Sequence, residues 1–386
     1  MTIKRAIFWL HLSAGMIAGI IIFTMSFTGV LLTYEKQIIA LAERQYYSNE
    51  RGLERLTADQ IIARARTAKP KAPRLTVIVA NHPDAPIIAQ SGRESKTLID
   101  PYTGEILGAG AENVEAFFSW VTAFHRWFAL EGDARRLGRQ ITGAANLLFL
   151  FLTVSGIYIW LPKIWRSQIL RNKLLFQGAY PSSKARDYNW HNVVGIWSVI
   201  PLLAVVTSAI VFSYPWAHTL VFKAFGEEPP QRMQRGGPPD QQDHRERQKG
   251  SETGRLFSYQ DLLQQAQERD SKWNRISIVV ASPSASLVDI TVDTGTGGEP
   301  FKQKILTYSR ASGELIKVGG AAHRSKGMQA RIFIRFLHTG ESFGLLGQTI
   351  AGLVSLGTCF LVYTGLALAY RRLVRPQLKR RERKSG

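Results

Sequence analysis

Four long segments without charged side chains constrain the fold of this chain more than any other feature. They cover residues 6–33, 141–161, 193–214 and 345–370, and each is about as long as a bilayer-spanning helix, roughly 20 residues. The overall hydrophobic fraction of 45% is ordinary for a soluble protein, so the signal lies in the clustering. The sequence predicts an α-helical membrane protein with four spans.

The first segment follows Lys4 and Arg5, as the core of a cleaved signal peptide would. Its apolar run is longer than the roughly 7–15 residues of such a core, and it ends without a small-x-small cleavage site. We therefore expect an uncleaved transmembrane helix.

Lys and Arg residues collect beside the spans on one side of the membrane. They lie at the N-terminus, in the connection 162–190 and in the tail 371–386. Short loops rich in Lys and Arg stay in the cytoplasm. We expect both termini in the cytoplasm, with residues of about 34–139 and 215–344 on the opposite side.

The formal net charge of +20 arises largely in these loops, where it attracts anionic lipid, so we do not expect a nucleic-acid partner. The only cysteine, Cys359, lies in the last span. A disulfide framework is therefore excluded, and the absence of Cys-x-x-Cys-His excludes covalent c-type haem attachment.

Internal similarity shows that the chain is a duplication of a helix, domain, helix unit. His11 and His191 are each followed four residues later by glycine and 23 residues later by tyrosine. The second and fourth spans correspond through Ser155-Gly156 and Thr364-Gly365, at an offset of 209 residues. His125 and His338 precede these two spans at matching positions.

The polar regions between the spans of each unit also correspond. Each contains a helix-like stretch (56–68; 257–269), strand-like runs (75–80 and 87–90; 275–280 and 287–292) and a hairpin signal (98–107; 306–315). We expect two small extracytoplasmic α+β modules. Residues of about 226–255 are rich in Pro, Gln, Gly and charge, which predicts a mobile insertion.

The expected organisation follows from these boundaries. In chain order it is helix 1 (6–33), module 1 (34–124), interface segment and helix 2 (125–161), cytoplasmic loop (162–190), helix 3 (191–214), module 2 with the insertion (215–337), interface segment and helix 4 (338–370) and basic tail (371–386).

Four histidines occupy equivalent positions, and they form one pair per membrane surface. We expect His11 and His191 near the cytoplasmic ends of their helices, and His125 and His338 at the outer face. Two neutral imidazoles facing across a helix bundle are the usual ligands of a non-covalent haem. An isolated histidine here would more often bond headgroups or backbone, but four at matched positions favour axial haem ligands.

The glycines four residues after His11 and His191 lie on the same helical face, where they leave room for the edge of a macrocycle. Zinc or copper alone would want carboxylate or thiolate ligands, and none lies at a fixed spacing. For the other histidines we favour structural roles, with His323 the best candidate for a substrate or haem contact; they are His82, His218, His244 and His323.

Four arginines flank the outer histidines: Arg126, Arg324, Arg331 and Arg335. They suit haem propionates or an anionic ligand, because a guanidinium matches a carboxylate. A role as solvated interface charges fits them equally well.

These motifs together resemble the PepSY-associated transmembrane family of bacterial inner-membrane proteins, over essentially the whole chain. The resemblance is carried by Leu-His-Leu-Ser-Ala-Gly at 10–15, Trp-His-Asn-Val-Val-Gly at 190–195, Leu-His-Thr-Gly at 337–340 and Asp-Pro-Tyr-Thr-Gly-Glu at 100–105. The second hairpin departs from the last motif, with Tyr-Ser-Arg-Ala-Ser-Gly-Glu at 308–314.

The resemblance implies a ferric-siderophore reductase of the ferrioxamine type. Two b-type haems, each with two histidine ligands, would carry electrons across the inner membrane, reduce a ferric siderophore in the periplasm and release ferrous iron. Without a Gly-x-Gly-x-x-Gly fingerprint, electrons would come from a quinol, a cytoplasmic reductase or a soluble flavin.

Two other functions compete with this one. PepSY modules elsewhere resemble protease-inhibiting or regulatory modules, so a membrane-bound regulator or sensor without a chromophore is the alternative. Ion-coupled transport is poorly supported, because the spans contain no carboxylate.

Overall fold

A computed structural model describes residues 2–50, 53–70, 72, 74–92, 95–230, 256–280 and 285–378. Most of the insertion expected at 226–255, His244 and the end of the basic tail lie outside these ranges. The chain divides into two compact units. The helical unit comprises Met1–Glu35, Phe117–Leu220 and Ile334–Gly386, and the sheet unit comprises Lys36–Ala116 and Val221–Phe333.

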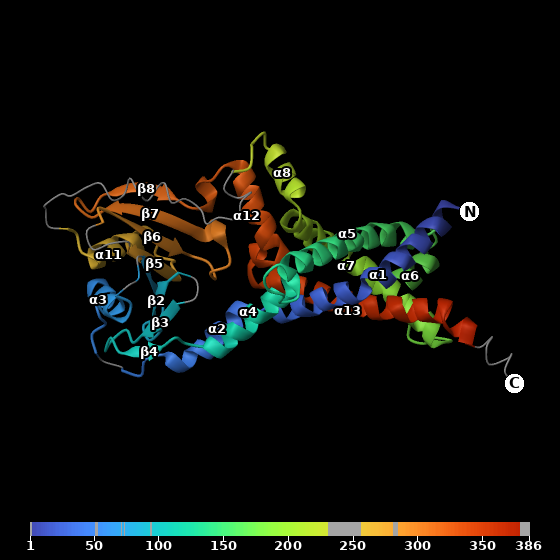
Figure 1. Cartoon of the computed structure of the whole chain (residues 1–386), viewed down its shortest axis with the longest axis horizontal. Coiled ribbons are helices and arrows are strands. Elements are labelled where there is room, and N and C mark those ends of the chain that lie inside the picture. Colours follow the sequence, from blue (N-terminus) through green and yellow to red (C-terminus); the bar gives the residue numbers. More distant parts are fainter. Residues whose placement is uncertain are drawn as a thin grey trace. The chain divides into compact units, whose positions relative to one another are not determined.

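Four long helices form the helical unit (Figure 1), and they are α1 (Ile3–Leu32), α5 (Ala134–Trp160), α7 (Ser183–Ser213) and α13 (Gly344–Leu373). Each is long and apolar enough to cross a membrane, as the four charge-free segments predict. Helix α1 packs on α5 and α13, and α7 packs on the same two helices. The two helices that carry His11 and His191 therefore lie diagonally across the bundle.

The outer surface of the bundle is apolar. Ile17, Ile20 and Ile200 are 72%, 73% and 79% exposed, whereas Ala14, Ala18 and Val206 face the interior and are buried. Exposed apolar side chains on every long helix, with backbone groups bonded within each helix, suit contact with lipid. The protein is thus a multi-pass membrane protein with an α+β region.

The sheet unit holds one antiparallel sheet of eight strands in the order β4-β3-β2-β1-β5-β6-β7-β8. The strands are β1 (Leu75–Ala80), β2 (Ile87–Ser91), β3 (Ser95–Ile99), β4 (Ile106–Gly108), β5 (Arg275–Val280), β6 (Leu287–Asp293), β7 (Gln303–Ser309) and β8 (Leu315–Gly319). Each half of the chain supplies four consecutive strands, close to the ranges that alternation predicts.

The two expected modules are joined into this single sheet. Strand β1 pairs with β5 along its whole length, from Leu75 opposite Val280 to Ala80 opposite Arg275. Inward residues of both halves therefore share one core, which contains Leu75, Ile87, Ile276 and Ile290. The sequence predicts two small α+β modules but not the pairing that joins them.

Helices α3 (Ala58–Ala68) and α11 (Tyr259–Arg269) pack on the sheet and on each other. Their N-terminal ends satisfy each other's amide groups. The backbone amides of Tyr259 and Gln260 donate to the Asp59 carboxylate, each at 3.0 Å, and the amide of Ala58 donates to Oε1 of Gln260 at 2.8 Å. This exchange ties the two repeats together at helix ends that otherwise lack acceptors.

The two hairpins have the same turn despite their different sequences. In the first, the amides of Tyr102 and Thr103 donate to Oδ1 of Asp100, both at 2.8 Å. In the second, the amide of Ser312 donates to Oγ of Ser309 at 3.3 Å. Gly104 and Gly313 both have φ of +71°, which a side chain would strain.

The remaining helices are shorter. They are α2 (Glu35–Glu43), α4 (Glu112–Trp127), α6 (Ser167–Leu174), α8 (Pro215–Lys223) and α12 (Lys326–His338), with 3₁₀ turns at Arg44–Tyr46, Pro300–Lys302, Ala321–His323 and Glu341–Phe343.

Candidate functional site: two histidine pairs in the helical unit

Each of the four repeat histidines bonds a hydroxyl group on one of the four long helices. In every case the histidine Nδ1 lies within hydrogen-bond distance of a serine or threonine oxygen. The pairs are His11 with Ser155 (2.8 Å), His125 with Thr28 (2.8 Å), His191 with Thr364 (2.9 Å) and His338 with Ser208 (3.1 Å).

The other hydrogen bonds of the four hydroxyl groups indicate which ring nitrogen of each histidine carries the proton. A hydroxyl has one proton, and each of these four reaches a backbone carbonyl one turn back on its own helix: Ser155 to Phe151 (2.6 Å), Thr28 to Thr24 (2.8 Å), Thr364 to Phe360 (2.9 Å) and Ser208 to Ala204 (2.7 Å). The hydroxyl oxygen then accepts from Nδ1–H. Nδ1 of His338 also lies 3.0 Å from the carbonyl of Val205, which can only accept.

Nε2 of each neutral ring is consequently left with its lone pair, which is the form of histidine that binds a metal. A hydrogen bond at the opposite ring nitrogen fixes both the tautomer and the ring orientation of a metal-ligating histidine. The same hydrogen bond therefore fixes the orientation in which each of the four rings would present Nε2 to a metal.

A small residue follows each of these hydroxyl residues and gives its imidazole room. A Cβ added at Gly156 would lie 3.6 Å from Cε1 of His11, and one at Gly365 would lie 3.4 Å from Cε1 of His191. Glycine in a helix interior costs roughly 1 kcal/mol relative to alanine. Both distances are those of ordinary van der Waals contact, so an alanine methyl at either position would touch the ring.

His11 and His191 line one cavity of about 430 Å³ inside the bundle, and we call them the inner pair. The volume falls in the range of cofactor pockets, roughly 300–1000 Å³. Its lining includes five glycines, namely Gly15, Gly19, Gly156, Gly195 and Gly365. Added Cβ atoms at Gly15 and Gly195 would meet protein only at 3.8 and 3.7 Å, so these positions are small without crowding from neighbouring helices.

His125 on α4 and His338 on α12 form the outer pair, outside the four long helices. Burial of the His125 ring, together with the nearby charge of His338, lowers its pKa to about 4. Burial also lowers the pKa of His338. Both rings are therefore neutral near pH 7, as a ligand must be.

Arginines gather near the outer pair. Desolvation, followed by the charges of Arg139, Arg135 and Arg335, lowers the pKa of Arg126. Three arginines also lie over the Trp127 ring. The guanidinium carbons of Arg126, Arg135 and Arg139 are 4.9, 4.0 and 5.3 Å from its centroid. Such mutual repulsion favours an anionic group at this place.

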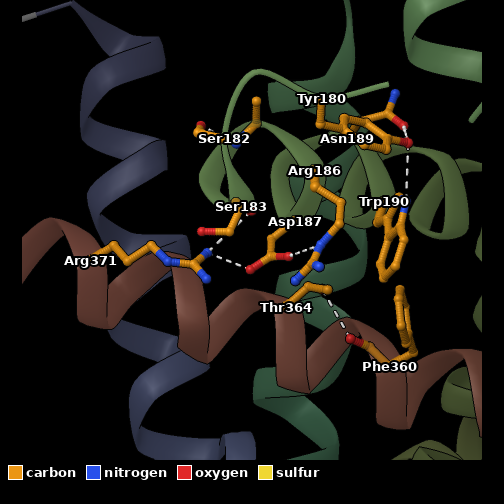
Figure 2. Close-up of polar contacts among 11 residues, drawn as sticks. Tyr180, Ser182, Ser183, Arg186, Asp187, Asn189, Trp190, Phe360, Thr364 and Arg371 are labelled. Carbon is orange, nitrogen blue, oxygen red and sulfur yellow. Dashed lines mark hydrogen bonds and ion pairs between the residues drawn. The ribbon is translucent and has the colours of Figure 1, made fainter. Parts of the chain in front are cut away.

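A buried carboxylate lies on α7 one helical turn before His191, and Figure 2 shows its two arginine partners. Asp187 is completely buried and accepts from Nε of Arg186 (3.0 Å) and from the Arg371 guanidinium of α13. Asp187 precedes His191 by one helical turn, and Arg371 follows Thr364 by two. The ion pair and the His191–Thr364 bond are thus neighbouring links along the α7–α13 contact.

The same figure shows how the start of α7 is anchored. Nε1 of Trp190 donates to the Tyr180 hydroxyl (3.0 Å), which donates to Oδ1 of Asn189 (2.8 Å). The centroid of the Trp190 ring also lies 5.3 Å from that of Phe360. The backbone carbonyl of Phe360 accepts the hydrogen bond of the Thr364 hydroxyl. The residue before His191 therefore contacts the turn that carries the His191 partner.

The other predicted candidates belong to other elements than the two pairs. His82 accepts from the amide of Asp84 (3.3 Å) and packs on Tyr47, which is the turn role expected for it. His323 belongs to the sheet unit, as do Arg324 and Arg331, while His218 lies on α8. Within the described ranges, no group of three or more His, Cys, Asp or Glu residues is placed to hold a metal ion.

Sequence reasoning found the histidines but not their partners. The four hydroxyl residues stood at matching repeat positions, so this equivalence was the available signal. Asp187 gave no such signal, because the corresponding residue of the first repeat is Ile7.

Comparison with known proteins agrees with the motif-based expectation. No curated protein sequence matches the chain. The model of the PepSY-associated TM region matches residues 8–372, which takes in most of the first and last spans, the whole of the other two and both histidine pairs. The chain therefore belongs to the family of the PepSY-associated TM region.

Proposed function

We propose that this protein is a dihaem oxidoreductase of a bacterial inner membrane, which passes electrons across the membrane to a ferric siderophore in the periplasm. One observation carries the proposal. At four repeat positions, the Nδ1 of a histidine forms a hydrogen bond with a hydroxyl group, which leaves Nε2 available. The four histidines form two pairs at different levels of one bundle.

The residues fit b-type haem: His11 and His191 would hold one group, and His125 and His338 would hold the other. The inner cavity is lined mostly by apolar side chains and glycines, which suits a flat apolar macrocycle. A bound haem supplies an iron that alternates between ferric and ferrous states and so carries single electrons.

The two histidine levels lie far apart along the helices. His11 and Thr28 are 17 residues apart on α1, or about 25 Å at 1.5 Å per residue. Between these levels the bundle interior contains Leu202, Val206 and Val354, with Phe149 and Leu150 packed against them. This apolar layer keeps water and ions from crossing, while the histidine pairs stand on either side of it.

The direction of transfer rests on the distribution of Lys and Arg, which favours a cytoplasmic position for the inner pair. The electron donor would be a quinol or a cytoplasmic reductase, and the acceptor a chelated ferric ion that leaves as ferrous iron. No general base or covalent nucleophile is required, because each turnover only adds one electron to the iron of the substrate.

The test is an optical spectrum of the detergent-purified protein, oxidised and then reduced with dithionite, with a haem-to-protein ratio. We expect two low-spin b-type haems per chain, reoxidised by ferric ferrioxamine with formation of ferrous iron that a ferrous-specific chelator traps. A colourless, folded protein would overturn the proposal and favour the regulator hypothesis.

Alanine variants then separate the two sites. His191→Ala should remove the inner haem and keep the outer one, and His338→Ala should do the reverse. His82→Ala is the matched control and should keep both. Loss of both haems in either ligand variant would contradict independent sites.

A further inference from the structure

The inner end of the bundle carries four cations on α7 and α13, and they divide into two kinds. Arg186 and Arg371 both bond the buried carboxylate of Asp187 (Figure 2). Lys184 and Arg372 have no ion-pair partner within the described part of the chain, and both line the cavity of the inner pair.

Helix geometry places these two cations at the same edge of the cavity. Lys184 precedes His191 by seven residues on α7, and Arg372 follows Gly365 by seven residues on α13. Seven residues are two turns, so each cation shares a face with the cavity residue on its helix, about 10 Å nearer the helix end. Long side chains from two different helices thus converge on the inner mouth.

The Arg372 side chain is also held in place. Its guanidinium carbon lies 4.5 Å from the ring centroid of Phe8, another cavity residue, and 5.2 Å from that of Trp9. Stacking on aromatic rings fixes the plane of a guanidinium group and leaves its N–H donors to bond an anion.

The charge of the cavity is one-sided. Its described lining contains Lys184, Arg372 and the two histidines but no carboxylate. An occupant that fits this lining is apolar along its body and carries two anionic groups at one edge, because a carboxylate beside Lys or Arg forms a charge-assisted hydrogen bond.

We propose that Lys184 and Arg372 bind the two propionate carboxylates of the haem held by His11 and His191, and so orient its polar edge toward the inner mouth. The proposal rests on the haem function proposed above. It assigns a binding role to Lys184 and Arg372, which does not follow from the two histidines alone.

The test compares haem with haem dimethyl ester, in which both carboxylates are blocked. Apoprotein in the His338→Ala background, which presents only the inner site, is titrated with each compound, and binding is followed by absorbance. One charge-assisted bond per cation predicts roughly tenfold weaker binding for each carboxylate lost, or about a hundredfold for the diester. The double variant Lys184→Met/Arg372→Met should bind both compounds about equally.

Two controls make the result decisive. Lys163→Met/Arg166→Met removes two positive charges from the connection between α5 and α7. Neither residue lines the cavity, so this variant should keep the preference for free haem. Lys184→Met alone should lose part of the preference for free haem over the diester. Lys184→Arg, which keeps the positive charge, should retain most of it. The proposal is overturned if the protein with both cations shows no preference, or if the double variant retains it, as expected when these cations face lipid headgroups. Failure to bind either compound would instead refute the haem function itself.

Discussion

The two halves of this protein build the same histidine contacts but fasten their helices differently. The first half uses α1, α4 and α5, and the second uses α7, α12 and α13, with corresponding histidine–hydroxyl bonds of 2.8–3.1 Å in both. At the inner end, Lys4 of α1 donates to the carbonyl of Leu161 beyond α5 (2.7 Å). In the second half, a buried Asp187 joins Arg186 and Arg371.

The residues that correspond to Asp187 and Arg371 in the first half are Ile7 and Pro162. The duplication therefore keeps the groups that suit a ligand and varies those that join helices. A buried ion pair has strict partners, whereas a lysine on a helix-end carbonyl tolerates movement. We infer that the α7–α13 contact is the more rigid side of the inner site.

The largest effect should follow from removing the buried carboxylate. Asp187→Ala removes two charge-assisted hydrogen bonds, one of which joins α7 to α13, and should lower the free energy of unfolding by about 3 kcal/mol. Lys4→Met should lower it by about 0.5 kcal/mol, because one exposed hydrogen bond is lost. The single, buried Cys359 offers a direct measurement, since a thiol-reactive dye reports opening of the bundle on heating. Equal losses in the two variants would contradict the difference between the halves.

An intermediate effect should follow from removing the histidine partners. Thr364→Val and Ser155→Ala each delete the acceptor for one inner Nδ1–H, and each should weaken inner haem binding by roughly 10–100-fold. Because the two bonds are alike, we expect similar losses in both halves. Thr349→Val serves as the control. Thr349 lies on the same helix as Thr364, but its hydroxyl bonds Tyr34 and not a histidine. Unchanged binding in both histidine-partner variants would show that these bonds do not orient ligands.

The smallest effect concerns the two hairpins. Asp100→Ala removes an acceptor of two amides and should destabilise the sheet unit by about 1–2 kcal/mol. Ser309→Ala removes the acceptor of one amide at a longer distance, so about 0.5 kcal/mol is expected. Urea unfolding of both full-length variants, followed by circular dichroism of the sheet signal, would measure the difference. A larger loss for Ser309→Ala would reverse the comparison.

The family match and the fold were within reach of the sequence, and the finer function stays a proposal. Charge-free segments, strand alternation and the duplication each produce a local pattern that can be read in a single chain. His125 and His338 illustrate the limit, because their repeat positions indicated depth in the membrane but gave no partner. Thr28 and Ser208 reach them from helices that lie 97 and 130 residues away in sequence.

The sequence by itself determined the elements, because a helix that crosses lipid must satisfy its backbone internally and be apolar for its whole length. Strands 75–80 and 275–280 were likewise visible as alternating runs. The tertiary structure alone decided that these two strands pair and fuse the modules, that Asp187 lies between two arginines, and that Lys184 and Arg372 share a cavity with His11 and His191. These contacts join residues far apart in the chain, so they depend on how helices and strands pack and not on local periodicity.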